Sequence, residues 1–377
     1  MRYVKNDYSE NERAWLWLSL SLGVKAARLR RRMLALGSPS ELYDAVRENG
    51  RLQGAGFISE ADAKKLASNA NDAVIDGFIE SLCAKGLYAV TIDSTDYPDL
   101  LRDIFDPPAV LYVAGRLRSL PEMPVAVIGS RKCSQYGLEM ADFFGRELAR
   151  HGICVVSGLA VGCDAEAARG ALSVAECSYP SVAVLGSGVD VLYPQKNRKL
   201  YDEIVERGAV VSELLPGSSP ARFNFVQRNR IISGMSRGVL VVEAGEKSGT
   251  SITVDFALEH GRDVFAVPGR ITDIMSRGTN LLIKRGTAKP VFDIEDILSE
   301  YGLSSEMISA ASPIKRVDTS GLDAKQVSIY NELLLGEKSI DELCEKTGFS
   351  VSELNIYLTE MELSGLIKQL PNKVYSA

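Results

Sequence analysis

Five short segments of the chain place glycine beside serine, arginine or lysine directly after an apolar run, and a sixth combines two arginines with two phenylalanines. Glycine lets backbone N–H groups approach an anion, while hydroxyl, guanidinium and ammonium groups bind phosphate oxygens. These residue types predict a surface for an extended phosphate chain. The predicted contacts are Gly129, Ser130, Arg131, Lys132, Ser157, Gly158, Ala160, Gly162, Asp164, Gly186, Gly188, Lys196, Arg228, Asn229, Arg230, Ser248, Gly249, Thr250, Gly269 and Arg270.

Three of these segments have a structural alternative that the sequence leaves open. VIGSRK offers N–H groups, a hydroxyl and two cations, or is a plain strand-to-helix turn with solvated side chains. SGLAVGCD matches GxGxxG loosely, and Asp164 is alternatively the N-cap of the next helix. After LGSGVDVLYP, Lys196 and Arg198 oppose the dipole of a helix N-terminus, which indicates either a bound anion or a solvated first turn.

The other three segments carry the same kind of ambiguity. EKSGT opens a predicted helix, so its hydroxyls and N–H groups suit phosphate unless Ser248 is a simple N-cap. Gly269 and Arg270 follow an apolar run and suit phosphate or a solvated loop. FNFVQRNRIISG (223–234) supplies arginines that we expect to precede a helix and to be difficult to bury together. Its two phenylalanines either stack on bases or belong to the core.

The chain is poor in groups for catalysis. Its two histidines, His151 and His260, are each followed by glycine, the pattern of a cation near the last carbonyls of a helix. We find no carboxylate pair, Ser–His pair or metal cluster beside the glycine-rich segments. The six cysteines form no CxxC pair and are expected to be reduced and mostly buried. We therefore expect no enzyme activity, no cofactor and no metal.

The glycine-rich segments follow short apolar runs of the kind that form buried parallel strands. The runs are VAVIG (125–129), ICVVSG (153–158), SVAVLG (181–186), AVVSEL (209–214), GVLVVEA (238–244) and DVFAVPG (263–269). Helical stretches such as YGLEMADFFGRELARHG and SITVDFALEHG alternate with them. The alternation predicts an α/β fold with an extended, doubly wound, mostly parallel Rossmann-type sheet. Parallel strands share one carboxyl edge, so the segments are expected to converge there.

Composition shifts divide the chain into four parts. Residues 1–70 are predicted to form a small helical module, and residues 71–298 the extended Rossmann core with a bridging segment at 71–123. Within the bridging segment LYAVTI (87–92) is strand-like, and turns are expected at DYPDLL and DPPAVLY. Residues 299–317 are Ser-rich and weakly periodic, typical of a linker. Residues 318–377 show three helices and a terminal ribbon, the outline of a winged-helix module.

Charge and hydropathy limit the partners. Of the 377 residues, 46% are apolar and 24% charged, and no apolar run approaches the about 20 residues that span a bilayer. The N-terminus has no apolar signal core, so we expect a cytoplasmic protein without a membrane partner. Residues 124–298 carry 20 basic and 20 acidic residues. Any nucleic acid must therefore bind to a local basic patch rather than to a global field.

The motifs together resemble one known family. GSRKCSQYG, SGLAVGCDAEAARGAL, AVLGSGVDVLYPQKN, NFVQRNRIISGMSRGVLVVEA, SGTSITVDFALEHGRDVFAVPG and SRGTNLLIKRGT are similar, in this order and with matching gaps, to the DprA/Smf family of bacterial natural transformation. The similarity covers residues 124–298 almost continuously. One departure is Ala168, where the family often has histidine.

The resemblance implies a protein that binds single-stranded DNA, protects incoming strands and loads the RecA recombinase. It also implies a homodimer formed through the core. Two alternatives are a sensor of a nucleotide-derived ligand and a hydrolase of the phosphoribohydrolase type. EKSGTSITVDFA lacks the paired glycines and the glutamate of the PGGxGTxxE motif, which disfavours the hydrolase.

The flanking modules give weaker signals. Residues 299–377 contain seven basic and twelve acidic residues, a net charge of −5, and SVSELNIYLTEMELSG has no basic residue. A DNA-reading helix is normally basic. We therefore expect the C-terminal module to contact protein or to be vestigial. The N-terminal RLRRRM run either touches DNA or is a solvated helix face.

Overall fold

The computed structural model describes residues 7–117, 123–246, 248–303, 322–334, 338–364, 366–370 and 374–376. The chain divides into two compact units, residues 1–308 and 309–377. Lys247 and most of the predicted linker lie outside the described residues.

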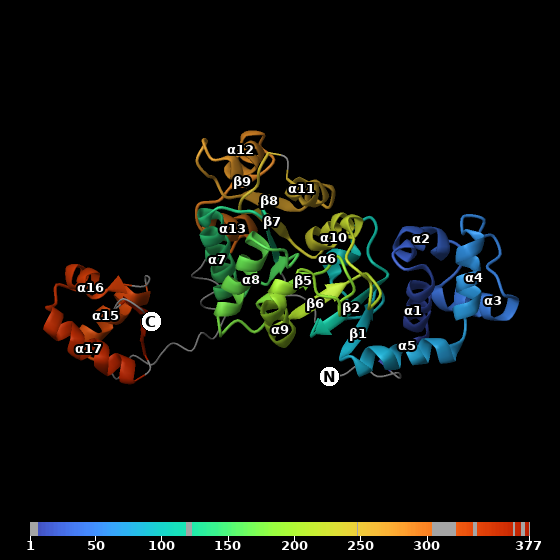
Figure 1. Cartoon of the computed structure of the whole chain (residues 1–377), viewed down its shortest axis with the longest axis horizontal. Coiled ribbons are helices and arrows are strands. Elements are labelled where there is room, and N and C mark those ends of the chain that lie inside the picture. The colour runs from blue at the N-terminus through green and yellow to red at the C-terminus, as the bar shows by residue number, and fades with distance from the viewer. Residues whose placement is uncertain are drawn as a thin grey trace. The chain divides into compact units, whose positions relative to one another are not determined.

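A nine-stranded sheet forms the centre of the first unit (Figure 1), in the order β1-β2-β6-β5-β4-β3-β7-β8-β9. The strands are β1 (Leu87–Thr91), β2 (Val110–Gly115), β3 (Val125–Ile128), β4 (Val155–Ser157), β5 (Ser181–Val184), β6 (Ala209–Ser212), β7 (Gly238–Val241), β8 (Asp263–Ala266) and β9 (Lys289–Pro290). Strands β3 to β9 are parallel, and β2 pairs antiparallel with both β1 and β6. The predicted doubly wound, mostly parallel Rossmann-type sheet is confirmed.

Helices cover both faces of this sheet. They are α6 (Asp99–Arg102), α7 (Gln135–Arg150), α8 (Cys163–Ser173), α9 (Arg198–Arg207), α10 (Arg222–Gly234), α11 (Thr250–Glu259), α12 (Arg277–Lys284) and α13 (Glu295–Leu298), with 3₁₀ turns η2 (Gln195–Asn197), η3 (Ile274–Ser276) and η4 (Ser299–Tyr301). All residues of β3 to β7 are buried, as expected for apolar runs covered on both faces. The helices fix the direction in which each loop leaves the sheet.

Two predictions about local structure are wrong. DPPAVLY was expected to be a turn, but its last residues begin strand β2, because Pro107 and Pro108 end before the pairing starts at Val110. The arginines of FNFVQRNRIISG were expected to precede a helix, but they lie inside α10, where no proline or glycine interrupts the first three turns. Both errors concern boundaries, and the second changes where two candidate contacts point.

Five helices precede the sheet in the first unit (Figure 1): α1 (Glu10–Leu22), α2 (Lys25–Leu34), α3 (Pro39–Asn49), α4 (Glu60–Asn69) and α5 (Asp72–Ala84). Capping boxes at Ser9 and Ser38 begin α1 and α3. The Trp17 indole donates to the Leu66 carbonyl at 3.0 Å, and the Ser19 and Tyr112 hydroxyls lie 2.8 Å apart. The helical part therefore shares a core with β2.

The second unit has its own small core. Helices α15 (Ala324–Leu334), α16 (Ile340–Thr347) and α17 (Val351–Leu363) pack around buried Leu343, Leu354 and Met361. Strands β10 (Lys338–Ser339), β12 (Val374–Ser376) and β11 (Lys368–Leu370) form an antiparallel sheet in that order. The predicted three helices and terminal ribbon are confirmed.

Candidate nucleic-acid interface

The carboxyl edge of the sheet brings the glycine-rich loops after β3, β4, β5 and β7 together near β3, where the strand order reverses. Ser130, after β3, donates its backbone N–H to the Glu243 carbonyl after β7 at 2.8 Å. The Asn197 side chain donates to the Leu159 carbonyl at 3.0 Å and so ties η2 to the loop after β4. Open α/β sheets bind ligands at such a reversal point. The convergence predicted from the sequence is present.

Most glycines at this edge are required by loop packing. A Cβ at Gly129 would collide with the Cys163 side chain, and one at Gly158 with the guanidinium of Arg228. Gly162, at φ +84°, leaves no room for a side chain beside the Ser130 carbonyl. Gly186 lies against the Phe225 ring, Gly188 against the backbone of residues 217–218 and Gly269 against Ser276. Only Gly249 among the predicted glycines has open space around it.

Two internal carboxylates occupy positions where a nucleotide phosphate would bind. Buried Glu243 accepts the backbone N–H and the hydroxyl of Ser134, the N-cap of α7, at 2.7 and 2.6 Å. Buried Asp164 accepts the Gly158 N–H at 2.9 Å, so it ties down a loop instead of capping α8, whose N-cap is Gly162. Burial raises the pKa of Asp164, against the opposing effect of Arg228. The chain's own carboxylates thus satisfy donors that a dinucleotide would need.

Arg228 and Arg230 were expected to be difficult to bury together, and this is wrong, because each has its own buried partners. The Arg228 guanidinium donates to the carbonyls of Gly158, at 2.7 Å, and Val184. Arg230 donates to both carboxylate oxygens of Glu213 at 2.6 Å. Burial lowers the pKa of Arg228 to about 10. In this conformation neither guanidinium faces solvent, so both hold the loops in place.

An exposed group that we call the Arg131 cluster stands beside these buried residues. It consists of Arg131, Tyr193 and Phe225. The Arg131 guanidinium lies over the Phe225 ring, 5.5 Å from its centroid, and the Tyr193 and Phe225 rings are also 5.5 Å apart. Tyr193 is 47% exposed, and Phe225 is half-buried against Gly186. An exposed cation beside a pair of aromatic rings suits a strand that offers both phosphates and bases.

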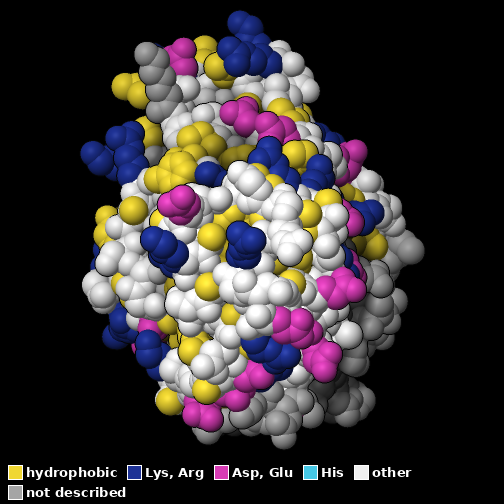
Figure 2. All heavy atoms as spheres, turned by 90° about the vertical axis from the view of Figure 1, so that its right-hand side faces the viewer, with side chains coloured by type: hydrophobic (Ala, Val, Ile, Leu, Met, Phe, Trp, Pro, Cys, Tyr) yellow, Lys and Arg dark blue, Asp and Glu magenta, His cyan; other side chains and the backbone are white. Residues whose placement is uncertain are grey.

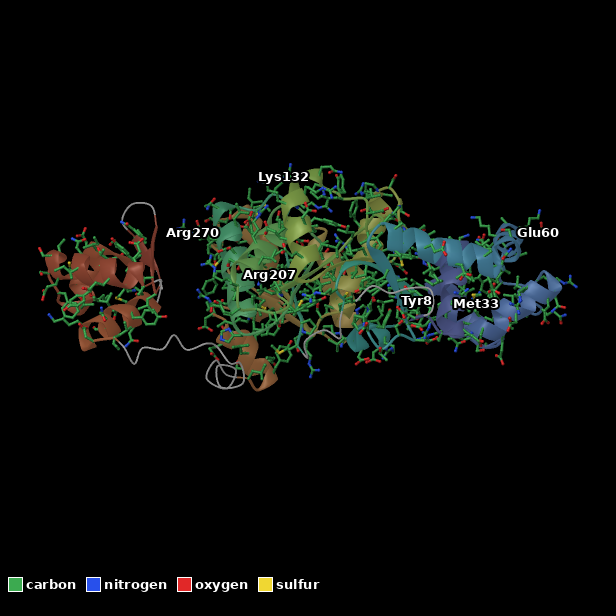
Figure 3. The ribbon with its side chains drawn as sticks, turned by 90° about the horizontal axis from the view of Figure 1, so that it is seen from below. Tyr8, Met33, Glu60, Lys132, Arg207 and Arg270 are labelled. Carbon is green, nitrogen blue, oxygen red and sulfur yellow. The ribbon has the colours of Figure 1, made fainter. Side chains whose placement is uncertain are left out.

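The remaining predicted contacts range from exposed to fully buried. Lys132, Lys196 and Arg270 are exposed, and Ser130 and Ala160 are half-buried. Lys132 and Arg270 lie at the margin of the core in Figure 3. Ser157 is fully buried and its hydroxyl accepts the Leu159 N–H at 3.3 Å, so it supports the loop from within.

The loops after β7 and β8 continue the same edge. Ser248 and Thr250 hydroxyls lie 2.8 Å apart at the start of α11, where Gly249 and not Ser248 is the N-cap. The Tyr136 hydroxyl donates to the Pro268 carbonyl at 3.0 Å and links α7 to the loop that ends in Arg270. The hydroxyls of Ser248, Thr250 and Tyr136 are hydrogen-bonded within the protein. The exposed guanidinium of Arg270 is therefore the more accessible group for a ligand.

The sequence missed several residues of this edge. Glu243 was not singled out. Phe225, one helical turn before Asn229, was not assigned a partner. Tyr193 had a signal, because it is an aromatic residue three positions before Lys196 of η2. Asn229 itself is half-buried within α10. Of the two phenylalanines left open, Phe223 is 55% exposed and Phe225 contacts Arg131, so Phe223 is not core.

One Ser–His pair contradicts the expectation that none exists near these segments. The Ser233 hydroxyl and the Nδ1 atom of His260 are 3.0 Å apart. Ser233 is fully buried in α10, so a substrate has no access to its hydroxyl. Burial, then the charge of Arg262, lowers the pKa of His260 to about 4. The imidazole is therefore neutral and does not act as a cation at the end of α11. His151 ends α7 as expected, with Nδ1 2.8 Å from the Glu147 carbonyl.

Known proteins share this fold and sequence. A family model described as DNA recombination-mediator protein A matches residues 88–302, and one described as DprA winged helix domain matches residues 316–373. Protein Smf of Escherichia coli is 38% identical over 290 residues, which cover 75% of this chain and 76% of that protein. DNA processing protein DprA of Streptococcus pneumoniae is 43% identical over 205 residues, or 54% and 71% of the two chains.

Solved structures also resemble the chain. The structure of DNA processing protein A from Streptococcus pneumoniae has a TM-score of 0.61 and 33% identity, and covers 78% of this chain and 98% of that one. DNA processing protein A from Helicobacter pylori, described for its single-stranded DNA binding mode, has a TM-score of 0.51 and 28% identity, with 56% and 95% covered. Among the described residues, no helix is long and apolar enough to cross a membrane. The matching sequence, the sheet and the winged-helix module together show that this chain belongs to the DprA/Smf family of DNA-processing proteins.

Proposed function

We propose that the chain binds single-stranded DNA at the carboxyl edge of its sheet. The Arg131 cluster carries this proposal, because it places an exposed guanidinium over the half-buried Phe225 ring, next to the exposed Tyr193 ring. Exposed Lys132, Lys196 and Arg270 extend the positive charge along the same edge. Bases stack on aromatic rings, and cations follow the backbone without reading sequence. The single-stranded DNA binding described for the Helicobacter pylori relative supports the proposal.

The same edge is poorly suited to a free nucleotide. Glu243 occupies the N-terminus of α7, and Asp164 occupies the loop after β4. A phosphate entering either place would meet a buried carboxylate and find its donors already bonded. This disfavours the sensor and hydrolase alternatives and favours a ligand that lies across the surface. We accordingly propose a binding role without catalysis.

We further propose that the bound strand is protected from nucleases and passed to the RecA recombinase during transformation, by a homodimer formed through the core. Family membership supports this part of the proposal. The C-terminal module then serves protein contacts, since α17 exposes carboxylates rather than cations.

Fluorescence anisotropy of a labelled oligothymidine tests the binding step. Single strands and duplexes are titrated at several salt concentrations, with ATP and NAD as competitors. We expect preferential single-strand binding that weakens steeply with salt and ignores both nucleotides. Displacement by either nucleotide, or equal binding of the duplex, contradicts the proposal. Recombinase loading is then measured as the acceleration of RecA filament formation on strands coated with a single-strand binding protein.

A further inference from the structure

Helix α2 presents an unusual density of positive charge next to the sheet edge. Its sequence KAARLRRRML contains one lysine and four arginines and no acidic residue. Three of the arginines, Arg28, Arg31 and Arg32, are exposed. Lys25 is paired with Asp62 at 2.8 Å, but within the described part of the chain none of these three arginines makes an ion pair. The charge of this helix is therefore largely available to a ligand.

Two of these arginines lie over aromatic rings that remain exposed. Arg28 lies 5.7 Å from the centroid of Phe223, and Arg31 lies 4.2 Å from that of Phe105. Phe223 is 55% exposed and Phe105 is 73% exposed. Arg28 and Arg31 are three residues apart and therefore share one face of α2. Large rings that stay accessible beside guanidinium groups mark a binding surface more than a packed interface.

Helix α10 joins this pair of contacts to the Arg131 cluster. Phe223 and Phe225 are two residues apart in the first turn of α10, and they contact Arg28 and Arg131 respectively. The Gln227 side chain also accepts a hydrogen bond from Arg28 at 2.9 Å. The two arginine–aromatic groups thus adjoin the same turn of α10 from different sides, although their arginines are more than a hundred residues apart in sequence. Figure 2 views the side of the molecule with the N-terminal helices and shows Lys and Arg side chains beside hydrophobic ones in its upper part.

The nearby carboxylates do not cancel this charge. Glu213 is bonded to Arg230 at 2.6 Å, and the Asp106 carboxylate lies 3.3 Å from the same guanidinium. Both acids therefore compensate a buried arginine of α10. A polyanion passing over Phe223 and Phe105 would meet the guanidinium groups of α2 first.

We propose that Arg28, Arg31, Phe105 and Phe223 form a second segment of the DNA path, which extends the strand from the Arg131 cluster onto α2. This inference rests on the proposed single-strand binding. Its ligand is the same DNA strand, with phosphates on the arginines and bases on the two rings. The extension adds about two nucleotides to the site, one for each ring. For the basic RLRRRM run the sequence left two alternatives open, DNA contact and a solvated helix face. The proposal assigns this run to DNA contact.

Binding of oligothymidines of different length separates the two segments. The variant R28Q/R31Q is compared with the full-length wild-type chain, using strands of about six and about twenty nucleotides. We expect unchanged affinity for the short strand and about tenfold weaker binding of the long one. The slope of log affinity against log salt for the long strand falls by about 1.4, because two phosphate contacts are lost. K64Q/K65Q, two exposed lysines of α4, is the matched control and behaves as wild type.

A tryptophan probe reports stacking directly. Both natural tryptophans, Trp15 and Trp17, are buried, so the variant Phe105→Trp carries the accessible indole. We expect the long strand to quench its fluorescence and the short strand to leave it unchanged. Phe105→Ala weakens long-strand binding while thermal unfolding stays as in wild type, because the ring is mostly solvated.

The outcomes distinguish this inference from the proposed function. If wild type binds neither strand, the proposed function fails and the extension fails with it. If wild type binds both but R28Q/R31Q keeps the full affinity for the long strand, the extension alone is wrong. Equal weakening for both strand lengths also overturns it, because α2 would then support the whole site and not lengthen it.

Discussion

The sheet edge of the core and helix α17 of the C-terminal module use their exposed charges in opposite ways. At the sheet edge Arg131 lies over Phe225 and faces solvent. On α17 the exposed Glu353 and Glu360 accept hydrogen bonds from Lys325 and Gln326 of α15. The sheet edge leaves a cation and aromatic rings accessible to a ligand. In the C-terminal module the cation Lys325 is instead paired with a carboxylate of α17.

This difference shows why net charge failed to locate the site. Residues 124–298 have equal numbers of basic and acidic residues, yet Asp164, Glu213 and Glu243 are buried and serve internal contacts. Arg228 and Arg230 are buried with them, so the exposed cations left among the predicted contacts at the edge are Arg131, Lys132, Lys196 and Arg270. A winged-helix fold does not imply DNA binding, because the function depends on the side chains that the fold presents.

The largest expected effect is on the free energy of unfolding, and it compares the loss of a buried ion pair with the loss of an exposed one. Glu213→Ala leaves the Arg230 charge buried with Asp106 as its remaining partner, and lowers the free energy of unfolding of the core by about 3–5 kcal/mol. Lys325→Gln removes the exposed pair with Glu353 and lowers the free energy of unfolding of the C-terminal module by less than about 1 kcal/mol. Urea unfolding of both variants measures this. Similar destabilisation by the two changes would contradict the contrast.

The next effect tests the cations of the sheet edge. Arg131→Glu removes the cation beside Phe225 and places a negative charge there, so single-strand affinity falls about a hundredfold. Strands of different sequence are affected equally. Arg150→Glu, at the other end of α7, is the control with the same charge change and leaves binding intact. Anisotropy with several strand compositions gives the answer, and a changed base preference would count against backbone contact.

Much of the fold was predictable from the sequence, since buried parallel strands are short apolar runs and all six predicted runs contain a strand of the sheet. The edge strands β1 and β2 were harder. Leu87–Thr91 was recognised as strand-like, but Val110–Gly115 was hidden by the prolines that precede it. Whether such a segment forms a strand depends on pairing with a strand that is distant in sequence, here β6. Local composition does not contain that information.

The candidate site was predictable in place but not in the role of each residue. Glycine-rich ends of parallel strands converge by topology alone, so Ser130 and Lys132 fall where they were expected. The roles of Arg228 and Arg230 depend on carbonyls and a carboxylate supplied by β5, β6 and their loops. Arg131 and Arg228 look alike in sequence, and only packing shows that one is exposed and the other buried.

A smaller effect concerns the pH dependence of the two units. The pKa of His260 is lowered to about 4 in the folded core. Between pH 6.5 and 4 this imidazole is therefore protonated in the unfolded chain but neutral in the folded one. Core stability therefore falls as pH decreases through this window, by about 1–2 kcal/mol after allowance for partial exposure. The C-terminal module has no histidine. Lys325 lowers the pKa of Glu353 to about 2, so that unit instead loses stability below pH 4.5.

Unfolding of wild type and His260→Gln across this range measures the effect. The variant keeps a polar side chain beside Ser233 but does not titrate, so the core of the variant should lose less stability between pH 6.5 and 4. The module's transition serves as the internal control. An identical pH profile for both proteins would show that other groups dominate the core.

The smallest expected effect comes from removing the acidic module altogether. Deleting residues 318–377 should change single-strand affinity by less than about threefold, because the deleted part contributes more acids than bases and no exposed arginine–aromatic pair among its described residues. The core has its own buried clusters and stays folded, which unfolding curves verify. A slight tightening is the favoured direction, since negative charge is removed. A large loss would mean that the module binds DNA in spite of its charge, and the contrast between the two regions would then be wrong.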